Sequence, residues 1–113
     1  MIRKIKAGVS VRGLAPEMLI ADAVVAAVYQ ELGALELVIT SIGDGTHGDH
    51  SLHTRDPLRI LATDYRRWTL RFETGGAVND RAPEAARLIQ HRLRDQFDVV
   101  LESDHLHVEF DPD

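Results

Sequence analysis

An alternation of polar and apolar residues near the end of the chain constrains the fold most. From His105 to Phe110 the sequence reads HLHVEF. Alternate side chains of a β-strand point to opposite faces, so His105, His107 and Glu109 should share one face and the apolar residues the other. The apolar face belongs to the core. We therefore expect a sheet whose opposite face carries imidazoles and requires polar partners.

The rest of the chain predicts both helices and strands. Pro16 suits a first helical turn, and apolar residues recur at helical spacing as far as Leu32. The β-branched segment 35–42 predicts a strand. Further elements are expected at 60–65 and 68–72 (one or two strands), 83–95 (helix) and 98–110 (two strands or one bent strand). This order predicts an α+β fold, a small antiparallel sheet with two helices packed on it, in a single domain over residues 1–113.

Charge and composition argue against several classes of protein. The formal net charge is −5, and the one basic cluster is Arg3, Lys4 and Lys6, so we expect no nucleic-acid partner. The residues after Lys6 include Arg12 and charged positions beyond it, so no apolar signal-peptide core follows the basic start. No segment approaches the apolar length of a membrane span. We expect synthesis in the cytoplasm and no membrane insertion.

Five of the six histidines fall into two clusters. The first, His47, His50 and His53, lies in a glycine-rich segment that predicts a loop, and the second is His105 and His107. The sixth, His91, is expected on the exposed face of the second helix. Single loop histidines such as His47 and His50 are more often supporting groups than ligands. His53 is the better ligand candidate.

A carboxylate and the His-x-His pair complete a possible metal site. Asp64 lies inside an apolar strand-like segment, where a buried carboxylate needs a partner. Because the chain has no cysteine, a metal must bind His, Asp or Glu. Two histidines and a carboxylate, with a fourth position open to water, form a catalytic zinc site. Glu102 and Asp104 stand beside the pair and offer two candidates for a general base.

These motifs resemble the zinc D-Ala-D-Ala carboxypeptidase and L-Ala-D-Glu endopeptidase group, which is related to lysostaphin-type peptidases and to the hedgehog domain. The group's signature is Ser-x-His-x-x-Gly-x-Ala-x-Asp, followed late in the chain by His-x-His or acid-x-x-His. Here the first part reads Ser51-Leu-His53 and then Ala62-Thr-Asp64, and the second reads ESDHLH over 102–107. The resemblance extends from the helix near Pro16 to Asp111.

The resemblance implies a role for each matching residue. His53, Asp64 and His107 are implied as zinc ligands, and His105 as the non-ligand histidine that stabilises the transition state. Asp104, three residues before His107, matches the position of the base. Glu102 stands three before His105, so a shifted register with Glu102 as base stays open. Ser51, at the start of the motif, is assigned to substrate binding.

The implied function is a zinc-dependent peptidase that cuts stem peptides of bacterial peptidoglycan, of the short phage or prophage type. Such a protein would act on the cell wall after release, with other lysis proteins, or as part of a virion. Ten residues separate His53 from Asp64, more than in the signature. This departure favours the alternative, a catalytically inactive, zinc-stabilised binding or structural module of the same fold. We expect Asp64, and not Asp56 before Pro57, to bind the metal, because the segment around Asp56 predicts a turn.

Overall fold

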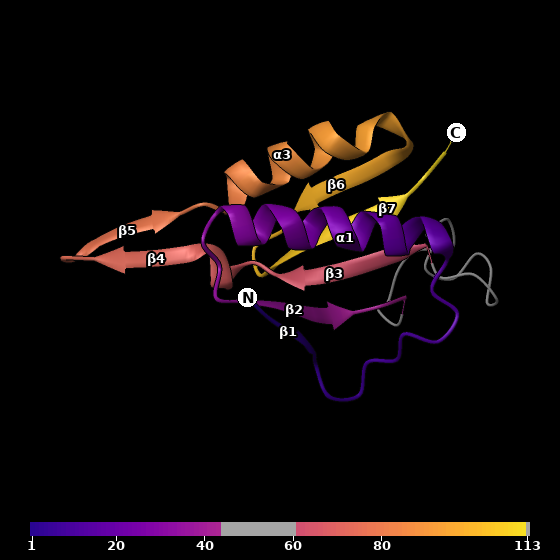
Figure 1. Ribbon diagram of the computed structural model, residues 1–113, viewed down its shortest axis with the longest axis horizontal. Coiled ribbons are helices and arrows are strands. Elements are labelled where there is room, and N and C mark those ends of the chain that lie inside the picture. The colour runs from indigo at the N-terminus through magenta and orange to yellow at the C-terminus, as the bar shows by residue number, and fades with distance from the viewer. Residues whose placement is uncertain (44–60, 113) are drawn as a thin grey trace.

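The structure, a computed structural model, describes residues 1–43 and 61–112. Within them, five strands form one sheet in the order β1-β2-β3-β7-β6, and two further strands form a separate hairpin (Figure 1). The elements of the sheet and its helices are β1 (Ile2–Ile5), α1 (Pro16–Glu31), β2 (Glu36–Ser41), β3 (Ala62–Arg66), α3 (Ala82–Leu93), β6 (Phe97–Leu101) and β7 (His105–Phe110).

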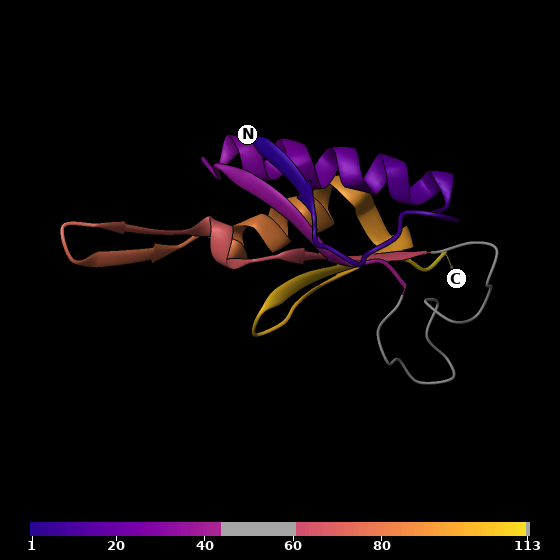
Figure 2. The ribbon, with the colours of Figure 1, turned by 90° about the horizontal axis from the view of Figure 1, so that it is seen from below.

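Both helices pack on the same face of the sheet. Figure 2 shows α1 and α3 together on one side of the strands. Helix α1 begins at Pro16, as predicted, and buries Val25, Val28 and Tyr29. Helix α3 buries Ile89 and other apolar residues of one stripe. These side chains join apolar residues of β2, β3 and β7 in one core cluster. The core therefore lies between the helices and the sheet. In the described residues, no helix covers the other face of the sheet.

The sheet is mixed. Strands β2, β3, β7 and β6 pair antiparallel, as expected, whereas β1 pairs parallel with β2. The basic start of the chain was not predicted as a strand. The segment Ile2–Ile5 is exposed along its whole length, so no buried face marks it in the sequence. It lies at the edge of the sheet and is added through backbone hydrogen bonds.

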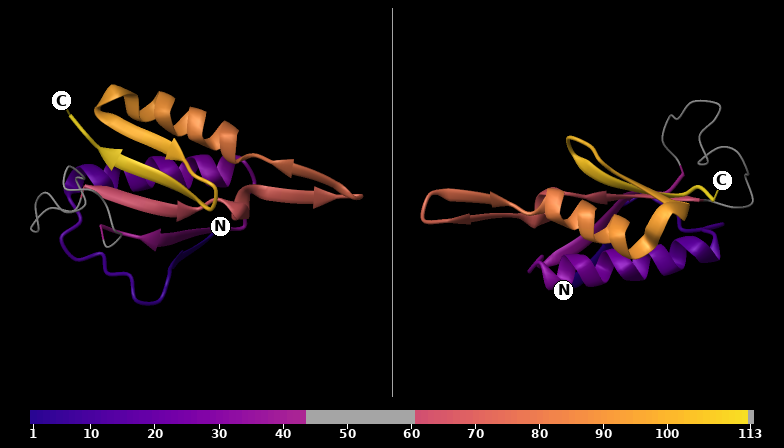
Figure 3. Two further views of the ribbon diagram at one scale, coloured as in Figure 1. Left: turned by 180° about the vertical axis from the view of Figure 1, so that it is seen from behind. Right: turned by 90° about the horizontal axis from the view of Figure 1, so that it is seen from above.

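The segment between β3 and α3 is the other departure from the prediction. Residues Trp68–Leu70 form a short 3-10 turn and not a strand. Strands β4 (Arg71–Thr74) and β5 (Ala77–Asp80) then form a hairpin that projects from one end of the molecule, as both views in Figure 3 show. Gly75 and Gly76 form its tip, and both have the positive φ that the favoured two-residue hairpin turn requires.

The α+β prediction is confirmed, with two helices on a sheet in the described residues. No helix in the parts of the chain described is both long and apolar enough to cross a membrane.

Candidate metal centre

Asp64 and His107 lie directly opposite each other on adjacent strands. The register of β3 and β7 pairs these two residues, and the alternation of both strands turns them away from the helices. The Asp64 Oδ1 atom lies 2.6 Å from His107 Nδ1. Asp64 is only 7% exposed, so its carboxylate has exchanged most of its water for these neighbours. The expectation that Asp64 needs a polar partner is met by an imidazole.

His105 approaches the same carboxylate from one strand position earlier. Its Nε2 lies 3.8 Å from Asp64 Oδ2, and its Nδ1 lies 2.6 Å from Asp104 Oδ1. The hydrogen bond from His105, together with the charge of the ring, lowers the pKa of the Asp104 carboxyl. Asp104 therefore stays ionised and holds His105 by one ring nitrogen while the other faces Asp64.

Glu109 holds the far side of the His107 ring. Its Oε1 lies 3.0 Å from His107 Nε2, so the ring lies between two carboxylates. Burial alone would lower the pKa of His107, but the hydrogen bonds and charges of Asp64 and Glu109 outweigh it and raise the pKa above the ordinary value. Glu109 was not predicted as a site residue, although its place on the imidazole face could be read from the alternation.

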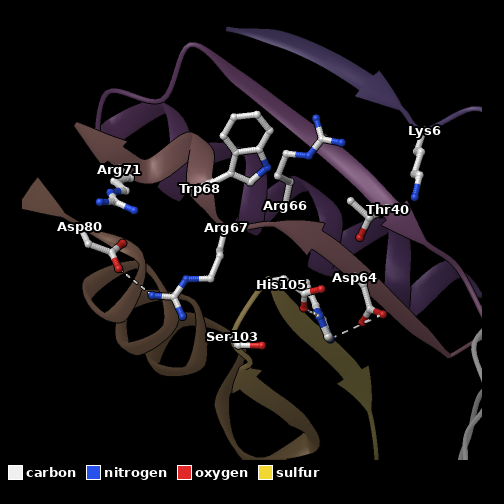
Figure 4. A pocket seen from close by; sticks show the side chains of 11 residues that line it. Lys6, Thr40, Asp64, Arg66, Arg67, Trp68, Arg71, Asp80, Ser103 and His105 are labelled. Carbon is white, nitrogen blue, oxygen red and sulfur yellow. Dashed lines mark hydrogen bonds and ion pairs between the residues drawn. The ribbon is translucent and has the colours of Figure 1, made fainter. Parts of the chain in front are cut away.

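A hollow of about 630 Å³ opens beside Asp64 and His105. Figure 4 shows its wall, which is formed by the end of β3, the Trp68 turn, the base of the hairpin and the β6–β7 turn. The register of β2 and β3 shifts between Ile39 and Ser41, opposite Asp64, and Thr40 in this irregular step lines the hollow. Bulges of this kind are frequent next to functional sites.

The two candidate bases lie in different places. Asp104 lines the hollow together with Asp64 and His105. Glu102 is exposed and is not among the residues that line it; its backbone closes the β6–β7 turn through a 2.8 Å hydrogen bond to the carbonyl of His105. This geometry favours the register in which Asp104 is the base.

The first histidine cluster lies outside the described residues. His47, His50, Ser51, His53 and Asp56 all fall in 44–60. Ser51 as a substrate-binding residue and His53 as a ligand therefore stay predictions. The described part of the chain brings Asp64, His105 and His107 together, and His91 is exposed on α3 as expected.

A second group of ligand types lies next to this centre. Asp98, Glu109 and Asp111 have ligand atoms within 4.8 Å of one another, and they form the one such group of three in the described residues. Asp98 is exposed and the other two are half-buried. Exposed acidic groups are common without a metal. This group is therefore an alternative metal site to the Asp64 centre, and mutation can test it.

Comparison with protein-family models, with curated proteins and with solved structures gave no match.

Proposed function

We propose that the chain is a zinc-dependent peptidase that hydrolyses peptide bonds in the stem peptides of bacterial peptidoglycan. The observation that carries this proposal is the meeting of Asp64, His107 and His105 beside a hollow, on the face of the sheet that α1 and α3 do not cover. These residues are the ones that the peptidase-like motifs single out. The peptide substrate itself is taken from the resemblance of those motifs.

The donors fit zinc. The carboxylate of Asp64 is nearly buried, which is costly without a cation, and it faces imidazole nitrogen. In a chain without cysteine, imidazole nitrogen and carboxylate oxygen are the usual ligands of zinc. Asp64 and His107 would supply two ligands, and His53 the third. Bound zinc lowers the pKa of its water and polarises a substrate carbonyl.

The chain's own groups supply the proton transfers. Asp104, kept ionised by its bond to His105, accepts the proton of the attacking water and later passes it to the leaving amine. The Nδ1–H of His105 donates to Asp104, and this contact fixes the orientation of the ring. When Nε2 also carries a proton, it can donate to the negative charge that develops on the substrate oxygen.

The site of action follows from the substrate. As a peptidase of the cell wall, the protein would act after release from the cytoplasm by lysis proteins or as a component of a virion. The proposal includes no nucleic acid partner, in keeping with the net charge of −5.

The test is release of new amino termini from purified peptidoglycan, with and without a chelator. We expect about one zinc per chain, as for a three-ligand site, and activity that the chelator removes and zinc restores. His107→Ala and Asp64→Asn should lose both zinc and activity. His91→Ala and Asp95→Asn, which change exposed residues elsewhere, are matched controls and should keep both. Full activity of the metal-free protein would falsify the proposal.

The longer spacing between His53 and Asp64 favours one second candidate, a zinc-stabilised module without activity. It predicts a different result in the same assay: zinc binds and raises the melting temperature, His107→Ala removes this increase, and no peptidoglycan bond is cut.

A further inference from the structure

The turn between β6 and β7 carries the proposed base. It comprises residues 102–104, and the amide of Glu102 closes it by donating to the carbonyl of His105 at 2.8 Å. The Asp104 side chain is 85% exposed, so packing does not fix its carboxylate. The position of that carboxylate depends on its contact with His105 and on the backbone of the turn. Because a base must lie within hydrogen-bond reach of the water it activates, this backbone needs support.

Arg67 joins the turn to the body of the protein. Its Nη1 donates to the backbone carbonyl of Glu102 at 2.8 Å, and its Nη2 donates to Asp80 Oδ2 at 2.7 Å (Figure 4). The Arg67 side chain is 20% exposed, which restricts its choice of rotamer. Within residues 1–43 and 61–112, no other side chain from outside the turn bonds to the backbone of 102–104.

The fold brings Arg67 to this turn. The register of β3 and β7 pairs Arg66 with His105, so the next residue, Arg67, leaves β3 beside the start of β7. The carbonyl of Arg67 accepts the amide of Leu70 at 3.0 Å in the 3-10 turn, and Leu70 is fully buried. The backbone from which the Arg67 side chain extends is therefore fixed.

The second partner of Arg67 is also fixed. Asp80, the last residue of β5, accepts from Arg67 at Oδ2 and from the backbone amide of Ala82 at Oδ1, 3.1 Å away at the start of α3. A continuous chain of hydrogen bonds thus runs from α3 through Asp80 and Arg67 to Glu102. Arginine suits this place because its planar fork offers donors on separate nitrogens, whereas lysine has a single nitrogen.

We propose that Arg67 is a positioning residue for the proposed base: by holding the carbonyl of Glu102, it fixes the turn and so places the carboxylate of Asp104. The role of Asp104 as base rests on the proposed function, whereas the support of the turn rests on these contacts alone. Arg67 takes no proton in this scheme. A displacement of about 1 Å in a reacting group can reduce a rate by on the order of 100-fold.

The first measurement separates kcat from KM on zinc-loaded protein, with peptidoglycan fragments solubilised by a muramidase as substrate. Arg67→Gln should lower kcat by about 10-fold or more, change KM by less than about 3-fold and keep its zinc. Arg67→Lys should show a similar loss, because the ammonium keeps the charge but cannot bond both acceptors in the same geometry.

Arg81→Gln is the matched control. Arg81 also bonds a carboxylate, that of Glu84, and a backbone carbonyl, that of Leu32 at 3.3 Å. It does not line the hollow. Its loss should therefore lower the melting temperature to an extent similar to the loss of Arg67 and leave kcat unchanged.

Amide hydrogen exchange on metal-free protein tests the support of the turn without any turnover. The Glu102 amide is bonded within the turn, so its exchange rate reports how often the turn opens. Arg67→Gln and Arg67→Lys should raise this rate by about 10-fold or more, the effect of one hydrogen bond to a charged group. The amide of Val108, inside the sheet between β3 and β6, should change little, and Arg81→Gln should change neither amide.

Each outcome has a distinct meaning. Unchanged exchange at Glu102 in Arg67→Gln would overturn the support of the turn. Faster exchange with an unchanged kcat would overturn the role in the reaction, and so would full rescue by Arg67→Lys, because charge alone would then suffice. A raised KM with an unchanged kcat would show that Arg67 binds substrate directly. If the wild-type protein cuts no peptidoglycan, the proposed function fails and the placing of a base fails with it, while exchange still decides whether Arg67 holds the turn.

Discussion

The carboxylate of Asp64 lies 2.6 Å from Nδ1 of His107, across the pairing of β3 with β7. The two residues are far apart in sequence, and the register of β3 and β7 places them directly opposite each other. This contact also assigns the nitrogens of the ring: Nδ1 faces the proposed metal position, and Nε2 faces Glu109.

The first prediction concerns Glu109. A carboxylate on the far nitrogen of a metal-binding imidazole fixes the ring and raises its basicity. Glu109→Gln should therefore weaken zinc binding by about 10–100-fold, measured by competition with a chromophoric chelator. Asp98→Asn is the matched control, because it removes a carboxylate of the neighbouring acidic group, opposite Glu109 on β6. If Asp98→Asn and Asp111→Asn lose zinc while His107→Ala retains it, the acidic group is the metal site.

The second prediction separates the two candidate bases. Asp104→Asn should keep zinc and lose on the order of 100-fold or more in rate, the scale of general-base catalysis. Glu102→Gln should lose much less, because Glu102 does not line the hollow. Rates on purified peptidoglycan, with zinc content measured on the same samples, decide between them. Comparable activity in both variants would remove carboxylate base catalysis from the mechanism.

The third prediction concerns alkaline pH. Burial, followed by the charge and hydrogen bond of Asp22, raises the pKa of Tyr65 well above its ordinary value, and burial raises that of Tyr29. The unfolded chain loses these protons near pH 10, whereas the folded chain keeps them. The stability linked to each tyrosine is fully present below about pH 10 and falls above it by about 1.4 kcal/mol per pH unit.

Urea unfolding at a series of pH values between about 9 and 11.5 measures this slope. Tyr65→Phe should reduce the fall in the free energy of unfolding by about 1.4 kcal/mol per pH unit, the effect of one proton. The variant also loses the 2.7 Å hydrogen bond to Asp22, so its stability at neutral pH should be lower. An unchanged slope in both Tyr65→Phe and Tyr29→Phe would mean that neither tyrosine stays protonated in the folded state.

The fourth prediction concerns Thr63, the neighbour of Asp64. Its side chain is buried on the helix side of β3, and within residues 1–43 and 61–112 its Oγ1 has no hydrogen-bond partner. A buried hydroxyl without a partner costs roughly 1–3 kcal/mol. Thr63→Val keeps the shape and the preference for a strand and should raise the free energy of unfolding by about 1 kcal/mol. Thr69→Val is a useful comparison, because the Thr69 hydroxyl contacts the carbonyl of Arg66 and its loss should not stabilise. A less stable Thr63→Val protein would show that the hydroxyl has a partner.

The sequence predicted the elements that have a periodic apolar pattern. Helix α1 and the strand β7 are such elements, and the alternation of β7 also gave the correct face for His105 and His107. Strand β1 could not be predicted in this way, because its four residues are all exposed and it is defined by its hydrogen bonds to β2. The strand predicted from residue 68 was wrong at Trp68–Leu70. Leu70 is buried as a strand residue would be, but the local backbone is helical.

The site was predictable to the extent that it lies on one strand. Because His105, His107 and Glu109 alternate along β7, their shared face follows from spacing alone. The contact of His107 with Asp64 depends on which strands pair and in which register, and no local pattern contains that information. The cations that line the hollow come from the ends of β1 and β3 and from the base of the hairpin, so only the folded chain reveals that Lys6 and Arg71 line the same hollow.

The place of β7 in the sheet has a consequence for the point in synthesis at which the proposed metal centre can form. Among the described strands β7 is the last to be synthesised, yet it lies inside the sheet, between β3 and β6. A nascent chain that ends between residues 64 and 104 contains Asp64 but lacks both His105 and His107. During translation the earlier strands can form with their helices, but the centre cannot assemble until this final strand is inserted between them. The proposed metal centre is therefore completed only late in synthesis, and a shorter ribosome-bound chain lacks it.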